Sequence, residues 1–336
     1  MRVGQLSVVL FCLAGSVVAR ASYEMVIFTT TTDRNFYRFD PVNRVQLGSF
    51  GAGVVGTYSG ASVSLDSGRP GQIVSLNGDA GIRWANYSTG LQTGQKFLSE
   101  GQIYGNGPYS VTPLSNGSYV VNAYYGSPTI QQRSRVYNAA FSSFTEMSPF
   151  GSGYEPLGSA QGSDGRIYTL NRFNLGSGNF AFVTFGFTTA GTYLGYNSLG
   201  SYADAYAFGS ILASGGRIYA GPGTQTTNPR IAWHPAGVSQ TATASIATSY
   251  YSTTGWSNLV AGHDGKVHMI QSYYNGTDYT NQWYTYEPES NRFAVMYAMP
   301  YNMTISRATM VAAPEPATWA AIGLGLLAIV RRKRTR

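Results

Sequence analysis

The chain has 336 residues, a formal net charge of +7 and only 11% charged residues, against roughly 25% in an ordinary globular domain. This low charge, together with 41 glycines and 26 tyrosines, excludes a protein built from long surface helices, because such helices need charged residues on their solvent side. Hydrophobic residues make up 43% of the chain and aromatic residues 14%, which is enough to build a core and argues against disorder.

The first 21 residues have the three parts of a secretory signal peptide. Arg2 provides the positive start, an apolar stretch follows, and Ala19 and Ala21 fit the small-x-small rule for cleavage, so the mature chain is expected to begin at Ser22. Cys12 is the only cysteine and lies in the apolar stretch. The mature chain is therefore predicted to have no disulfide, no catalytic thiol and no thiolate metal site.

A repeat of about 49 residues runs through the body of the chain. Small turns that contain glycine recur, and their glycines lie at positions 68, 117, 165, 216 and 265, at intervals of 49, 48, 51 and 49. An aromatic residue at the end of a short strand recurs in phase with them, as Phe39, Trp84, Tyr137, Phe185, Trp233 and Tyr286. Asp-Gly and Asn-Gly turns supply the positive φ that a tight hairpin needs. Each repeat is therefore predicted to hold two hairpins, or four strands.

Four strands in 45 to 50 residues are typical of one blade of a β-propeller. The aromatic hairpin occurs six times and the glycine hairpin five times, so we expect residues 23–29 to pair with residues 304–311 and to close the ring. The prediction is an all-β body from 22 to 312 with six blades. A seventh blade would require an extra strand pair within 51–65, and a β-sandwich or β-helix is the alternative fold.

The histidines and carboxylates do not form a catalytic pattern. His263 and His268 flank a turn at positions that Ser and Tyr occupy in other repeats, and His234 takes a similar turn position, so we interpret them as structural. Glu287 and Glu289 are separated by a proline in a turn, unlike the facing carboxylates of a glycosidase. The sequence has no Asp-x-Asn-x-Asp calcium loop and no Gly-x-Ser-x-Gly nucleophile motif. It thus indicates no catalytic residue, no metal site and no cofactor.

Aromatic side chains are more numerous than alternating strands can bury. The candidates for an exposed ligand surface are Tyr124, Tyr125, Tyr273, Tyr274 and Trp283. Tyrosine rings flanked by Asn, Ser and Gln could stack against the sugar rings of a neutral polysaccharide. Packing between blades is the alternative interpretation for each of them.

The C-terminus has the pattern of a short membrane anchor. Pro314, Glu315 and Pro316 precede an apolar run over 317–330, and a cationic cluster follows it, formed by Arg331, Arg332, Lys333, Arg334 and Arg336. A helix of this length spans only ~21 Å, less than the ~30 Å hydrocarbon core, so the flanking side chains would have to snorkel. The cations predict that 331–336 stay in the cytoplasm and that the body lies outside.

This order of features resembles the PEP-CTERM sorting signal of Gram-negative bacteria: Pro-Glu-Pro, a short apolar helix that opens with Trp319, and a terminal Arg cluster. The resemblance covers residues 313–336. It implies export, transient anchoring in the inner membrane and processing near Glu315 by an exosortase-type enzyme. Ala313 and Ala317 depart from the family's usual Val and Ser but leave the central tripeptide intact. Bearers of this tail often belong to bacteria that produce exopolysaccharide, which is therefore an implied partner.

We expect an exported cell-envelope or extracellular-matrix protein whose propeller is a non-catalytic binding or scaffold module. The alternative is a secreted hydrolase or lyase that acts on extracellular polysaccharide through the propeller channel, which would need charged residues converging at one end of that channel. Ice or surface binding would need a flat Thr-rich face, and the run 29–32 is too short for it. Most of the net charge lies in the two ends, so the body is nearly neutral and nucleic acid is not an expected partner.

Overall fold

The described part of the chain consists of strands and turns. The computed structural model describes residues 23–29, 36–41, 44–50, 62–76, 81–98, 110–126, 130–147, 153–223, 226, 229–237, 242–245, 255–262, 264–299 and 305–312. They form 25 strands in six antiparallel sheets, five of four strands and one of five. The predicted signal peptide, the sorting tripeptide, the apolar run and the terminal cations lie outside the described residues.

We number the sheets in chain order and name the strands of each sheet from its first strand to its last. Sheet 1 contains β25 (Ile305–Ala312), β1 (Tyr23–Thr29), β2 (Phe36–Asp40) and β3 (Val45–Phe50). Sheet 2 contains β4 (Ser62–Leu65), β5 (Gln72–Leu76), β6 (Gly81–Asn86) and β7 (Gln92–Phe97). Sheet 3 contains β8 (Ser110–Pro113), β9 (Tyr119–Gly126), β10 (Ile130–Tyr137) and β11 (Phe144–Glu146).

The remaining three sheets follow the same order. Sheet 4 contains β12 (Tyr154–Gln161), β13 (Ile167–Gly176), β14 (Asn179–Phe187) and β15 (Tyr193–Tyr202). Sheet 5 contains β16 (Ser210–Ser214), β17 (Arg217–Gly221), β18 (Arg230–Pro235) and β19 (Ala242–Ser245). Sheet 6 contains β20 (Gly255–Trp256) and β21 (Val260–Ala261), which both pair with β22 (Val267–Tyr274), followed by β23 (Tyr279–Glu287) and β24 (Arg292–Met299).

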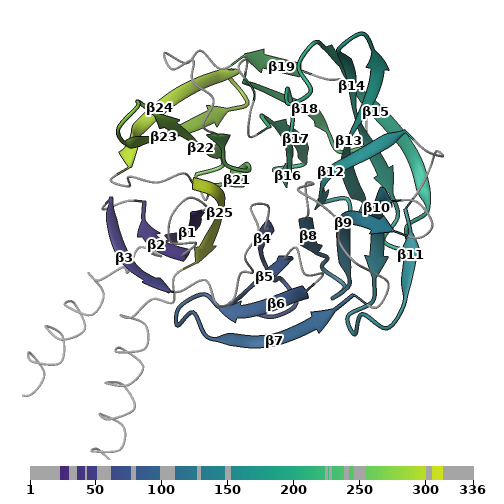
Figure 1. Ribbon diagram of the computed structural model, residues 1–336, viewed down its shortest axis with the longest axis horizontal. Coiled ribbons are helices and arrows are strands. Elements are labelled where there is room, and N and C mark those ends of the chain that lie inside the picture. Colours follow the sequence, from purple (N-terminus) through teal and green to yellow (C-terminus); the bar gives the residue numbers. More distant parts are fainter. Residues whose placement is uncertain are drawn as a thin grey trace, which may run out of the picture.

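The sheets stand around a central axis in a β-propeller arrangement, with the first strands inside and the last strands at the rim (Figure 1). Each first strand contacts the first strand of the next sheet, from β25 through β4, β8, β12, β16 and β21 back to β25. Sheet 1 joins the first and the last of the described strands, because β1 pairs with β25 from Tyr23 opposite Ala312 to Thr29 opposite Ile305. This pairing confirms the closure that the sequence predicts.

The recurring aromatic residues build the core between sheets. All six lie on the third strand of their sheets, and five of them are at most 2% exposed, while Trp233 is half-buried. The second strands differ from the expected alternation of buried and exposed residues. In β5, β13, β17 and β22, four or more consecutive residues are buried, because neighbouring sheets cover both faces of a strand this close to the axis.

Small polar side chains connect the first strands around the axis. Ser64 donates its hydroxyl to the carbonyl of Val111 at 2.9 Å, and Thr112 donates to the carbonyl of Ser159 at 2.9 Å. Asn258, between β20 and β21, bonds both backbone groups of Ala308 on β25 at 2.9 and 2.8 Å. The Asn258 amide thus continues the hydrogen bonding across the junction of sheets 6 and 1, where the ring closes.

Among the described residues, no helix is long and apolar enough to cross a bilayer.

Candidate functional site

The turns between the first and second strands of sheets 2 to 6 lie on one side of the ring. Their described residues are 66–71, 114–118, 162–166, 215–216, 262 and 264–266. Contacts beside these turns connect neighbouring sheets: Ser115 N donates to Gln161 Oε1 at 2.7 Å, and Arg217 pairs with Glu289 at 2.8 Å. We call this side the turn face. The opposite side carries the turns between second and third strands, described at 177–178 and 275–278, and we call it the hairpin face.

Asp66 holds together sheets 2 and 3 at the turn face. Its Oδ2 accepts the indole N–H of Trp84 at 2.7 Å and the hydroxyl of Tyr119 at 2.8 Å, while Oδ1 accepts the backbone N–H of Gly68 at 3.0 Å. The carboxylate is buried with the Asp66 residue only 2% exposed. Burial, and then the bond to Asp66, raise the pKa of Tyr119 to about 12, so its hydroxyl remains a donor. The guanidinium of Arg69 covers the Trp84 ring 4.1 Å from its centroid.

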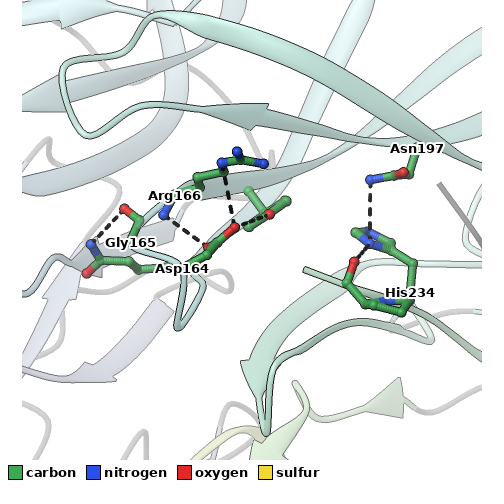
Figure 2. Close-up of polar contacts among 8 residues, drawn as sticks. Asp164, Gly165, Arg166, Asn197 and His234 are labelled. Atoms are coloured by element: carbon green, nitrogen blue, oxygen red, sulfur yellow. Dashed lines mark hydrogen bonds and ion pairs between the residues drawn. The ribbon is translucent and has the colours of Figure 1, made fainter. Parts of the chain in front are cut away.

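Asp164 repeats this arrangement in sheet 4 (Figure 2). Its Oδ1 accepts the backbone N–H of Arg166 at 3.1 Å, and its Oδ2 accepts the hydroxyl of Tyr168 at 2.7 Å and lies 3.7 Å from the Arg166 guanidinium. Burial, and then the bond to Asp164, raise the pKa of Tyr168 to about 12. The Arg166 side chain also reaches sheet 5. Its Nη1 lies only 3.0 Å from the position that a Cβ atom would take on Gly237.

Asp264 occupies the equivalent turn in sheet 6 and contacts a histidine. Its Oδ1 lies 3.0 Å from His268 Nε2, and Trp283 donates its indole N–H to His268 Nδ1 at 2.8 Å. Because an indole nitrogen only donates, His268 must be the neutral tautomer that donates Nε2–H to Asp264. Burial lowers the pKa of His268, although Asp264 opposes the shift. His268 therefore takes the position of Tyr168, as the repeat predicts, and both ring nitrogens are used inside the protein.

His234 is buried, whereas the sequence suggests a turn position. It lies near the end of β18 with no exposed surface and contacts sheet 4, where Thr184 Oγ1 is 2.8 Å from its Nε2. Its Nδ1 donates to the carbonyl oxygen of Pro235 at 2.9 Å and lies 3.4 Å from the side-chain nitrogen Nδ2 of Asn197 (Figure 2). Burial lowers the pKa of His234. The strand continues past the expected turn at this point, which places the ring between two sheets.

These networks have the chemistry of structural junctions. The carboxylates of Asp66 and Asp164 and both nitrogens of His268 are engaged by donors or acceptors of the chain itself. Within the described ranges, no three residues among His, Cys, Asp and Glu gather as a metal site. His263, the other histidine considered as a metal ligand, lies outside those ranges.

Two of the candidate ligand-surface aromatics are in the core, which corrects the sequence analysis. Trp283 is 2% exposed and packs against Phe39 of sheet 1, with ring centroids 6.3 Å apart. Tyr125 is 5% exposed, and the guanidinium of Arg135 stacks 3.8 Å above its ring. Both rings fill the space between neighbouring sheets, which a strand pattern alone does not reveal. The side chain of Tyr124 lies outside the described part of the chain.

The other two candidates lie at the hairpin face. Tyr274 is 41% exposed, Tyr273 is half-buried, and both precede the turn 275–278. Tyr274 pairs across the hairpin with Tyr279, with ring centroids 5.0 Å apart and a 42° angle between the rings. Asn275 fixes the turn by accepting the backbone N–H groups of Thr277 and Asp278 at 2.9 and 2.8 Å. The hairpin thus holds two tyrosine rings side by side, of which Tyr274 is exposed and Tyr279 half-buried.

The sequence does not reveal the contacts that join the sheets: Asp66 with Tyr119, His234 with Thr184, and Asn258 with Ala308. The one local signal is the turn carboxylate itself, which recurs at 66, 164 and 264. Tyr168 and His268 follow their carboxylates by four residues, whereas the partners of Asp66, Trp84 and Tyr119, lie 18 and 53 residues away.

Comparison with known families assigns the C-terminal end of the chain. Residues 312–334 match the PEP-CTERM protein-sorting motif. The chain carries a PEP-CTERM sorting motif. This motif implies an exported protein whose C-terminal region anchors it in a membrane and is processed by an exosortase. The comparison with curated proteins found no match.

Comparison with solved structures concerns the body that precedes the PEP-CTERM motif. A protein of unknown function from Bacteroides caccae is 10% identical with a TM-score of 0.54, over 86% of this chain and 99% of that chain. The β-propeller domain of Cps50 (Swd1) from Myceliophteria thermophila is 8% identical with a TM-score of 0.48, over 86% of this chain and 90% of that chain. At such identities the likeness concerns the fold alone.

Proposed function

We propose that this PEP-CTERM protein is an exported cell-envelope or extracellular-matrix protein whose body is a non-catalytic binding or scaffold module. The observation that carries the proposal is the sorting motif at 312–334, attached directly to a propeller body whose described histidines and turn carboxylates bond to other groups of the chain.

The proposed organisation has three parts. Residues 1–21 are a signal peptide, 22–312 are a propeller, and 313–336 are the sorting segment. Each of the six sheets is one blade, and the ring of contacts among their first strands supports this number. In the sorting segment, a helix at about 317–330 spans the inner membrane and 331–336 remain cytoplasmic, until an exosortase-type enzyme cuts near Glu315 and releases the body to the cell surface or the medium.

The partner of the body is proposed to be an exopolysaccharide, bound at the hairpin face. The pair of exposed Tyr274 and half-buried Tyr279 supports this choice, because aromatic rings held beside a hydrogen-bonded turn offer an apolar surface with polar tips. The nearly neutral body suits a neutral polymer better than a strongly charged one.

Two measurements test the proposal. The intact mass of the released protein should correspond to a chain without residues 1–21 and without the residues beyond about Glu315. A released full-length species would contradict the processing.

Binding of the released body to an array of glycans should then fall about tenfold in Tyr274→Ser, which corresponds to ~1.4 kcal/mol. Tyr196→Ser is the matched control, because Tyr196 is 60% exposed but lies on the rim strand β15. Equal loss in both variants, or no binding by the wild type, would contradict the proposed polysaccharide site.

A further inference from the structure

Both ends of the body leave the propeller on the turn face. In sheets 2 to 6 a turn of this face joins the first strand to the second. In sheet 1 the corresponding strands are β25 and β1, which no turn joins, because β25 ends the body and β1 begins it. Tyr23 and Ala312 are paired opposite each other at that point. The position of the missing turn is therefore the exit of the chain.

The sorting motif begins at the residue where β25 ends. The match starts at 312, and Ala312 is the last residue of that strand. Five Cα-to-Cα steps separate Ala312 from Ala317, where the apolar run starts, and they reach at most about 18 Å. The eight residues of β25 extend about 24 Å from the hairpin face to the turn face. The connection is therefore too short to let the hairpin face approach the membrane.

The exit also lies close to the propeller axis. β25 is the first strand of sheet 1 and contacts β4 on one side and β21 on the other, in the inner ring of strands (Figure 1). A short connection from the middle of a face keeps that whole face near the anchor, whereas a connection from the rim would let the body swing away.

We propose that, while the tail is attached, the turn face lies against the lipid headgroups of the membrane and the hairpin face points away from it. This inference rests on the proposed anchoring by the C-terminal segment. Ligands then reach the hairpin face, with Tyr274 and Tyr279, before processing, whereas the turn face becomes accessible only after the tail is cut.

The length of the connection, and not charge, sets this orientation. In the turns between first and second strands, each aspartate has a cation within three residues: Arg69 follows Asp66, Arg166 follows Asp164 and Lys266 follows Asp264. Arg69 and Arg166 lie 3.9 and 3.7 Å from their carboxylates, and Lys266 lies 3.7 Å from Glu287. Such a balanced set of charges gives no strong attraction to anionic lipid on its own.

The two ends of β22 provide a matched pair of reporters. Lys266 lies just before the strand on the turn face with its side chain 40% exposed, and Thr277 lies just after it, exposed on the hairpin face. The chain has one cysteine, Cys12, so Lys266→Cys or Thr277→Cys in a Cys12→Ala background places a single thiol in the mature body. The full-length variants are labelled with a thiol-reactive fluorophore and reconstituted into phosphatidylcholine vesicles that contain lipid with a nitroxide headgroup.

Quenching by the nitroxide should be roughly twofold or more stronger at 266 than at 277, because about 24 Å of strand separates the two positions. Equal quenching, or stronger quenching at 277, would overturn the orientation. Insertion of 30 Gly/Ser residues after Ala312, with an r.m.s. span of roughly 30 Å, should abolish the difference. A difference that survives the insertion would overturn the role of the short connection.

Vesicle flotation separates failure of the orientation from failure of the anchoring. Protein that floats with the vesicles but is quenched equally at both positions contradicts the orientation alone. Protein that does not float with the vesicles contradicts the proposed anchoring and, with it, this inference.

Discussion

Asp66 is the side chain whose removal should damage the propeller most among the three turn carboxylates. Its carboxylate is buried and accepts bonds from Trp84 and Tyr119, which are 1% and 2% exposed. In Asp66→Ala these two donors stay buried without an acceptor, and Tyr119 loses its hydrogen bond to sheet 2 while its ring contact with Trp84 remains. The substitution changes the hydrogen bonding while it leaves the aromatic core in place.

The expected loss is about 3–5 kcal/mol of unfolding free energy. Each of the two buried donors left without an acceptor costs about 1–3 kcal/mol, and hydrogen bonds to a charged group lie at about 1.5–3 kcal/mol. The matched control is Asp264→Ala at the equivalent turn of sheet 6. The Asp264 side chain is 46% exposed, so water replaces it beside His268, and the expected loss is about 1 kcal/mol.

Guanidinium unfolding followed by tryptophan fluorescence measures both variants, and Trp84 serves as a reporter inside the affected network. A double-mutant cycle of Asp66→Ala with Tyr119→Phe isolates the hydrogen bond between sheets 2 and 3 and keeps Trp84 as the reporter. We expect a coupling of about 1–3 kcal/mol. If Asp66→Ala costs no more than Asp264→Ala, or if the coupling is zero, the reasoning from buried donors is refuted.

Two further predictions concern pH and ring closure. Burial lowers the pKa of His234 in the folded state, so the unfolded chain binds its proton first and stability should fall as pH drops below ~6.5. His234→Gln should reduce this slope between pH 7.5 and 5.5 in urea titrations, and an unchanged slope would show that His234 does not contribute. Asn258→Ala removes both bonds to Ala308 and should cost about 1–3 kcal/mol, with faster amide exchange in β25 and β1. Unchanged exchange in those strands would contradict the role of Asn258 in closure.

The tail and the repeat could be predicted from the sequence because both are encoded locally. A tripeptide, an apolar run and terminal cations in fixed order identify the sorting motif without any fold. Turn glycines and strand-end aromatic residues recur every 49 residues or so. A hairpin is determined by residues that are close together in the sequence. The pairing of the terminal strands followed from counting hairpins, since one sheet lacked its first turn.

The side of each strand that faces a neighbouring sheet is set by the assembled propeller. Trp283 and Tyr274 belong to the same hairpin, yet Trp283 packs against Phe39 of sheet 1 while Tyr274 reaches solvent. Alternation with a period of two separates the two faces of a strand. It does not show which face is buried when a neighbouring sheet lies on each side. The same limit hid the burial of His234 and the contact of Asp66 with Tyr119, because those partners lie about 50 residues apart and meet only when the ring is assembled.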